Sequence, residues 1–290
     1  MLSLLGAFSL LSLSLLVALF NILQWLMAPY LVDAIYRVRA LDEERHPELH
    51  RILDELSERS GISRPRLMLA ELPIPNAFAY GSPLTGGRVA VTSGLLRTLE
   101  LEEVEAVIGH ELGHIRHRDV QVMMFASFLP SLFYLLARST LYPYYGYYTG
   151  RRRGDYTALA LVGAVSMFIY FLLLIFTLSL SRLREYYADQ HCASIVDDGG
   201  RKLAEALAKI STYTSRMGRA KTLGLGSFKT LFIADPDRAA ADVRELRYGG
   251  RDEELVRSLL ERRLTWIDRF LELFSTHPNV VRRIRALMGQ

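Results

Sequence analysis

The sequence is poor in cysteine and carries little net charge, and each of these shortages excludes certain classes of protein. A single cysteine, Cys192, occurs among the 290 residues, which excludes an intrachain disulfide framework and a zinc site built on cysteine ligands. The formal net charge is only +4 at pH 7, and no basic helix is interleaved with aromatic residues. We therefore expect no nucleic-acid partner.

Charged residues are also missing from three long runs, at Leu2–Tyr30, Val120–Ala137 and Ala158–Leu180. A helix of about 20 apolar residues crosses a bilayer, so we expect three transmembrane helices. The first run is longer than the apolar part of a signal peptide and has no basic residue before it, so we expect it to be retained. The lipid bilayer is therefore an expected partner of this chain.

The chemistry of the chain centres on His110-Glu111-Leu112-Gly113-His114. Two histidines four residues apart lie on one face of a helix, where both imidazoles can bind one zinc ion. The glutamate directly after the first histidine is the usual general base of a zinc peptidase. Acidic residues at 102, 103 and 105, followed by an apolar stripe, predict that this motif lies on a helix.

A catalytic zinc ion takes three protein ligands and keeps one open position, so the sequence must supply a third ligand. Glu185 follows the third apolar run, which returns beside the second because the loop between them is short, so we expect Glu185 near the two histidines. Asp189, four residues further on, is expected to hold the other ring nitrogen of a ligand histidine. His117 is the alternative third ligand, and simple ion pairs of Glu185 and Asp189 with Arg182 and Arg184 are the plainer interpretation.

The remaining pattern predicts short elements around this motif. Amphipathic helices are predicted at Glu43–Ser60, Arg201–Ser211, Glu253–Phe274 and Val281–Met288. Strands are predicted at Pro65–Leu72 and Arg88–Thr92, and the Gly86-Gly87 turn favours a hairpin whose exposed edge can bind an extended peptide. The catalytic helix is expected to continue straight into the second apolar run. We expect His46 and His50 to be solvated, tyrosines over 142–148 to form an interfacial belt, and residues 214–250 to form an irregular surface lobe.

These elements predict a mainly α (α+β) fold in three parts. A transmembrane helix occupies residues 1–37, a zinc metallopeptidase domain is formed by residues 38–119 and 181–290, and a transmembrane hairpin over 120–180 is inserted in that domain. One zinc ion can join His110 to Glu185 only if both parts of the domain share one side of the membrane. Arginines near the membrane ends favour the cytoplasm for that side, although the loop at Arg151-Arg152-Arg153 is also basic.

Five stretches occur in an order that resembles the HtpX-type membrane metalloendopeptidases, relatives of the CAAX prenyl proteases. They are Pro75-Asn76-Ala77-Phe78-Ala79, Val89-Ala90-Val91-Thr92-Ser93-Gly94-Leu95-Leu96, His110-Glu111-Leu112-Gly113-His114, Ser181-Arg182 with Glu185-Tyr186-Tyr187-Ala188-Asp189, and Ser275-Thr276-His277-Pro278 with Arg283-Ile284. The resemblance covers residues 38 to 290. One departure is that HtpX proteins usually carry two spans before the catalytic part, whereas one is found here.

The resemblance implies a helical gluzincin fold with a small β-hairpin or sheet and one zinc ion on His110, His114 and Glu185. It implies Glu111 as the base and a substrate-facing edge near Asn76, Ala77 and Phe78. The family places a His-Pro at His277, so His277 is a candidate to stabilise the oxyanion, and Tyr186 and Arg283 are weaker candidates.

The sequence therefore predicts a zinc endopeptidase in the cell membrane, with its catalytic part in the cytoplasm. The resemblance implies polypeptide substrates, namely damaged or misfolded membrane proteins. One alternative is a CAAX-type processing protease. Another is a membrane scaffold or chaperone with a purely structural zinc, but such a site needs no base, and Glu111 is present.

Overall fold

The computed structural model describes residues 10–141, 153–216 and 252–289. The expected tyrosine belt over 142–148 and nearly all of the expected surface lobe over 214–250 lie outside these residues. The chain separates into two compact units. One consists of Met1–Leu26 and Gln121–Ser179, and the other of Met27–Val120 and Leu180–Gln290. Three helices among the described residues, α1, α5 and α6, therefore begin in one unit and continue in the other, and the domain limits proposed from the sequence stay a prediction.

Three helices among the described residues are long and apolar enough to cross a membrane, as the charge-free runs predicted. They are α1 (Leu10–Tyr36), α5 (Asp119–Leu141) and α6 (Arg153–Ile195). In the first unit α5 and α6 pack closely, because Gly163 has no side chain and a Cβ there would lie 2.6 Å from Thr140 Oγ1. Large side chains on these helices point outward, which fits a lipid environment, and Phe125 among them is 72% exposed.

The second unit contains a four-stranded sheet in the order β1-β2-β4-β3. Its strands are β1 (Val38–Ala40), β2 (Arg66–Ala70), β3 (Ala77–Ser82) and β4 (Gly86–Thr92). The predicted hairpin exists, but β3 forms it with β4, whereas β2 runs parallel to β4. The sequence did not reveal β3 as a strand, because its small residues lack the usual alternation of polar and apolar side chains. Because β3 is last in the sheet order and, among the described strands, pairs only with β4, it is an edge strand.

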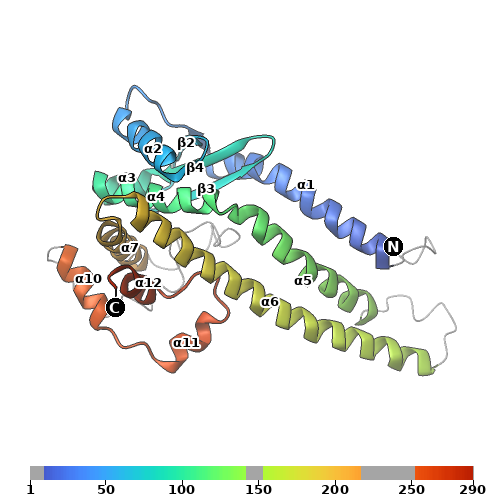
Figure 1. The fold of residues 1–290 in the computed structure, drawn as a ribbon. Coiled ribbons are helices and arrows are strands. Elements are labelled where there is room, and N and C mark those ends of the chain that lie inside the picture. Colours follow the sequence, from blue (N-terminus) through green and yellow to red (C-terminus); the bar gives the residue numbers. More distant parts are fainter. Residues whose placement is uncertain (1–9, 142–152, 217–251, 290) are drawn as a thin grey trace. The chain divides into compact units, whose positions relative to one another are not determined.

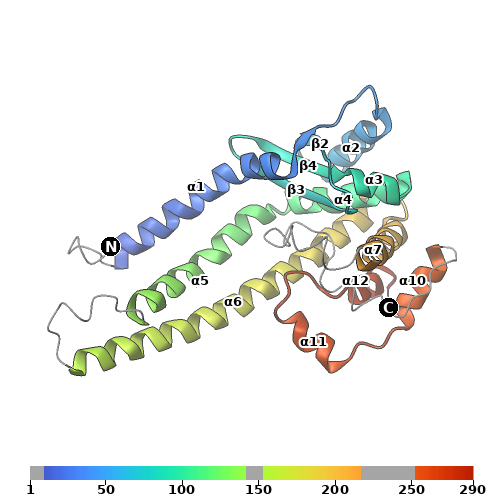
Figure 2. The same cartoon turned by 180° about the vertical axis from the view of Figure 1, so that it is seen from behind.

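Helix α4 (Leu101–Arg116) runs through the middle of this unit (Figure 1). The sheet and α2 (Pro47–Ser60) pack on one side of it, and α7 (Gly199–Arg216) packs on the other. Figure 2 shows from behind that α10 (Asp252–Glu261) and α12 (Val280–Leu287) extend the layer of α7. One hydrophobic core joins these elements, including Leu53, Val89, Leu112 and Ile284. The short α3 (Ser93–Thr98) connects β4 to α4.

Two helices predicted as continuous are interrupted. The predicted helix over Glu253–Phe274 is in fact α10 followed by α11 (Trp266–Glu272), because Thr265 and Asp268 form a capping box that begins a new helix. The catalytic helix does not run straight into the second span. It ends at Arg116, Arg118 takes a left-handed conformation with φ of 55°, and α5 begins at Asp119.

The expectation that His50 is solvated was wrong, because its side chain is only 7% exposed. Its Nε2 lies 3.1 Å from the carbonyl oxygen of Leu41, and its Nδ1 lies 3.1 Å from a guanidinium nitrogen of Arg64. Both partners lie outside α2, so the local pattern of that helix could not reveal them.

Candidate metal centre and active site

Helix α4 carries the whole His-Glu-x-x-His motif. The helix begins with a capping box, in which the Glu100 and Glu103 side chains accept hydrogen bonds from each other's backbone. Such a cap stabilises the start of a helix and so fixes the register of the residues that follow. His110 is fully buried, Glu111 is 3% exposed and His114 is partly buried. The motif therefore lies inside the protein, where water is largely excluded.

The structure brings Glu185 of α6 to the two histidines. The Nε2 atoms of His110 and His114 lie 3.1 Å apart. The Glu185 carboxylate oxygens lie 3.7 Å from the first and 3.6 Å from the second of these nitrogens. Ligands of one tetrahedral zinc ion at about 2.1 Å lie about 3.4 Å from each other, so these spacings fit a single ion. Among the described residues this is the one group of His, Cys, Asp and Glu side chains close enough to hold a metal ion.

Two glycines on α4 allow α6 to come this close. A Cβ atom at Gly113 would lie 2.9 Å from the Cα of Ala188, and one at Gly109 would lie 2.8 Å from a methyl of Val196. The contact is reinforced where Cys192 Sγ approaches the carbonyl oxygen of Ala106 at 3.1 Å. At position 113 only glycine lets the two helix backbones approach without displacement, and at position 109 glycine leaves room for the Val196 side chain just after α6.

A carboxylate lies behind each histidine, on the side away from Glu185. Asp189 Oδ1 lies 3.0 Å from His110 Nδ1, in the position that the sequence suggested. Asp119 Oδ2 lies 2.6 Å from His114 Nδ1, and sequence reasoning missed this residue. A carboxylate that accepts a hydrogen bond from Nδ1–H leaves the Nε2 lone pair available to a metal ion. The available signal was an acidic residue five positions after the second histidine, where the helix was expected to continue.

Asp119 is in turn held by Arg184 of α6, which forms an ion pair with its carboxylate. The same guanidinium donates a hydrogen bond to the His117 carbonyl oxygen at 2.7 Å. These contacts stabilise the left-handed turn at Arg118, although Arg118 is not a glycine. The break between α4 and α5 thus depends on α6, and it folds Asp119 back toward His114.

The guanidinium of Arg283, on α12, lies between the two carboxylates of α6. Its Nε and Nη2 donate to Asp189 at 2.9 and 2.6 Å, and its Nη1 lies 3.0 Å from Glu185 Oε2. Arg283 is 1% exposed. Burial acts to lower the pKa of Arg283, but the Asp189 and Glu185 carboxylates raise it above the ordinary value. Arg283 therefore orients these carboxylates, and its suggested role in stabilising the oxyanion stays a prediction.

Glu111 lies beside this cluster and against the sheet. Burial raises the pKa of the Glu111 carboxyl above its ordinary value, while His114 and His110 act in the opposite direction. The backbone N–H of Ala79, on the edge strand β3, donates a hydrogen bond to this carboxylate. A general base works best when its pKa is close to the working pH, so a raised pKa suits that role.

Asn76 directly precedes β3, Ala77 and Phe78 begin it, and all three residues are 1–3% exposed. The backbone N–H of Thr92 donates a hydrogen bond to the Asn76 carbonyl oxygen, so residues 76, 78 and 80 exchange backbone hydrogen bonds with β4. In an antiparallel ladder the alternate residues, Ala77, Ala79 and Gly81, then direct their backbone groups to the free edge. This edge therefore presents free backbone groups, whereas the side chains of Ala77 and Phe78 are buried.

His277 is 5% exposed, and its Nε2 lies 3.7 Å from Glu185 Oε1. The structure thus brings His277 to the same cluster, with its Nδ1 3.0 Å from Thr276 Oγ1. His117 does not join this cluster. It caps the end of α4, and its ring lies 5.7 Å from the ring of His191 and 5.9 Å from that of Tyr187.

A His-His-Glu cluster with a buried glutamate beside it, in a chain with three membrane-spanning helices, defines a membrane metallopeptidase. Comparison with known proteins gives the family. The model of peptidase family M48 matches residues 43–290, and the chain belongs to this family.

Named relatives agree with this assignment. The chain is 36% identical over 277 residues to a "Protease HtpX homolog" of Thermoplasma acidophilum, covering 92% of this chain and 81% of that protein. It is 38% identical over 285 residues to a "Protease HtpX homolog" of Aeropyrum pernix, covering 95% of this chain and 84% of that protein. The resemblance to HtpX-type proteases found in the sequence is therefore confirmed.

A solved structure shares the fold. Ste24p of S. mikatae matches with a TM-score of 0.58 and 16% identity. The match covers 96% of this chain but only 58% of that chain. At this identity the likeness concerns the fold alone, and it confirms the expected mainly helical fold with a small sheet.

Proposed function

We propose that this chain is a zinc-dependent endopeptidase in which His110, His114 and Glu185 bind one zinc ion per chain. The observation that carries the proposal is the spacing of the three donor atoms, between 3.1 and 3.7 Å. Two imidazoles and one carboxylate form a donor set typical of catalytic zinc, which keeps a position open for water. Asp189 and Asp119 support this set by holding the two histidine rings.

Glu111 acts as the general base in this proposal. Zinc, when bound, polarises the scissile carbonyl and makes water acidic enough to react at neutral pH. The Glu111 carboxylate accepts a proton from the attacking water and returns it to the departing amine. The Ala79 N–H keeps this carboxylate oriented toward the site. His277, next to Glu185, is our candidate for stabilising the oxyanion.

A polypeptide substrate would bind along the free edge of β3. An extended peptide pairs with an exposed sheet edge through backbone hydrogen bonds. Ala77 and Gly81 direct backbone groups to this edge, and Ala79 lies between them with its N–H on Glu111. The scissile bond would then lie close to Glu111. Asn76 orients the strand, because its N–H donates to Thr92 Oγ1 at 2.9 Å.

We further propose that the substrates are damaged or misfolded membrane proteins and that the catalytic part lies in the cytoplasm of the cell. Arg37, Arg39, Arg116 and Arg118 flank the first two spans on the catalytic side, and cytoplasmic segments carry an excess of such residues. Labelling of cysteines introduced at Ser93 and Asp252, in a Cys192→Ala background, should find both inside. Opposite faces would contradict the shared zinc site, whereas two outside positions would contradict only the orientation.

Activity is tested with the full chain in lipid nanodiscs and three substrates. These are an unfolded soluble protein, a membrane protein with a destabilised helix, and a prenylated CAAX peptide. We expect cleavage of the first two, sensitivity to chelators and no cleavage by Glu111→Gln. Selective cleavage of the prenylated peptide would favour a processing protease. Bound zinc without any cleavage, in wild type and Glu111→Gln alike, would favour a scaffold.

A further inference from the structure

The short helix α11 turns its apolar side outward. Five large apolar side chains occupy one side of it at helical spacing, and each is 49–76% exposed: Trp266, Ile267, Phe270, Leu271 and Phe274. None of them belongs to the hydrophobic core clusters of the described residues. A contiguous exposed patch of this kind marks a surface that contacts an apolar partner.

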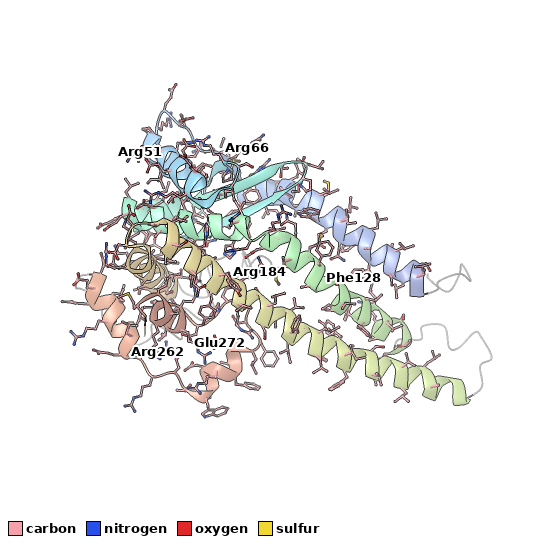
Figure 3. All side chains as sticks on the ribbon, in the orientation of Figure 1. Arg51, Arg66, Phe128, Arg184, Arg262 and Glu272 are labelled. Atoms are coloured by element: carbon pink, nitrogen blue, oxygen red, sulfur yellow. The ribbon has the colours of Figure 1, made fainter. Side chains whose placement is uncertain are left out.

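The polar side of α11 faces the protein. Asp268 closes the capping box with Thr265 and lies 4.0 Å from Arg262. Glu272 is buried at 7% exposure, accepts a hydrogen bond from the Asn279 N–H at 3.1 Å and pairs with Arg282 at 3.2 Å. Arg262 and Glu272 are labelled in Figure 3, before α11 and at its end. A helix at a water-facing surface has the opposite arrangement, with its apolar side inward.

A single arginine ties the end of α11 to the third span. Arg182 Nη1 donates to the carbonyl oxygens of Glu272 and Ser275 at 2.8 Å. In the sequence Arg182 is the first charged residue after the charge-free run that begins at Ala158 and ends at Ser181. We therefore expect α6 to leave the hydrocarbon core near Arg182, and the contacts of Arg182 with Glu272 and Ser275 would then place the C-terminal end of α11 at the same level.

We propose that α11 lies in the interfacial layer of the bilayer, with Trp266, Phe270 and Phe274 at the boundary between headgroups and acyl chains. Tryptophan and phenylalanine on one side of an amphipathic helix are typical of such interfacial segments. Because α11 leads directly into Ser275–Arg283, bilayer docking also holds the segment that carries His277 and Arg283.

The chain has only two tryptophans, which makes the proposal directly measurable. In a Trp25→Phe variant, Trp266 is the sole tryptophan fluorophore. Reconstituted in nanodiscs, it should emit at short wavelength and resist quenching by aqueous iodide. Lipids brominated near the headgroup should remove most of its emission, and lipids brominated at the chain ends should remove less.

A matched control places the same fluorophore on another exposed apolar site. Leu101 is 47% exposed at the start of α4, the end away from the span α5. In a Trp25→Phe, Trp266→Phe, Leu101→Trp variant, iodide should quench the fluorescence of the tryptophan at position 101, and brominated lipid should not quench it. The proposal is overturned if iodide quenches Trp266 as it quenches the control. It is equally overturned if Trp266 resists both quenchers, because a protein surface such as a second copy would then cover α11.

Discussion

Replacing Asp119 by alanine should weaken zinc binding without removing any ligand. The substitution deletes the carboxylate that lies 2.6 Å from His114 Nδ1 and fixes that ring. Loss of such a partner typically costs about 10–100-fold in metal affinity, or about 1.4–2.8 kcal/mol. Arg184 also loses an ion pair, so folding stability should fall by about 1–3 kcal/mol. Zinc affinity is measured by competition with a chromophoric chelator, well below the melting temperature of the variant.

Two variants separate the effect on His114 from a general effect of removing charge. Asp119→Asn keeps an oxygen that can accept from Nδ1, so its affinity should lie between those of the wild type and Asp119→Ala. Asp197→Ala removes a carboxylate that is 92% exposed and should leave zinc affinity unchanged. If Asp119→Ala binds zinc as tightly as the wild type, Asp119 does not support the metal site and the reasoning fails.

Four further outcomes follow from the same geometry. Glu111→Gln should retain stoichiometric zinc by metal analysis and lose about 10²–10⁴-fold in turnover, and loss of zinc would make Glu111 a ligand. Gly113→Ala places a Cβ 2.9 Å from a backbone atom of Ala188, so thermal melting should show a loss of about 1–3 kcal/mol, and an unchanged melting temperature would contradict the helix contact. Asp33→Asn leaves Arg88, which is 8% exposed, without the carboxylate that pairs with it. Because Asp33 is partly exposed, chemical denaturation should show that the free energy of unfolding falls by about 3 kcal/mol, the low end for a broken buried pair. A chelator should lower the melting temperature of the wild type, since free metal at 1,000 times its Kd adds about 4 kcal/mol to the free energy of unfolding. An unchanged melting temperature would contradict tight binding.

Local pattern was enough to predict the parts of the fold that local forces determine. The three spans follow from uninterrupted apolar runs, and the catalytic helix follows from its acidic first turn and apolar stripe. The meeting of Glu185 with the two histidines was also within reach, because two adjacent spans joined by a short loop return the chain to one side. Its role as a ligand remains a prediction.

The features that the sequence did not reveal depend on distant contacts. Asp119 reaches His114 only because the chain turns at Arg118, and Arg184 of α6 stabilises that turn. The edge strand β3 has no hydrophobic alternation, and its identity follows from pairing with β4. The acidic residue at 119 is visible in the sequence, but its contact with His114 is not, and the segment that forms β3 looks like an ordinary loop.

The balance of buried charge at this site gives an independent reason for a divalent cation. Four nearly buried carboxylates surround the histidines, namely Glu111, Asp119, Glu185 and Asp189. Two guanidinium groups, those of Arg184 and Arg283, lie within this cluster and pair with three of these carboxylates. With all four carboxylates ionised, two negative charges remain to be matched, and an unbalanced buried charge is strongly unfavourable. One Zn²⁺ held by His110, His114 and Glu185, as we propose, would supply that charge and so offset the cost of burying these carboxylates.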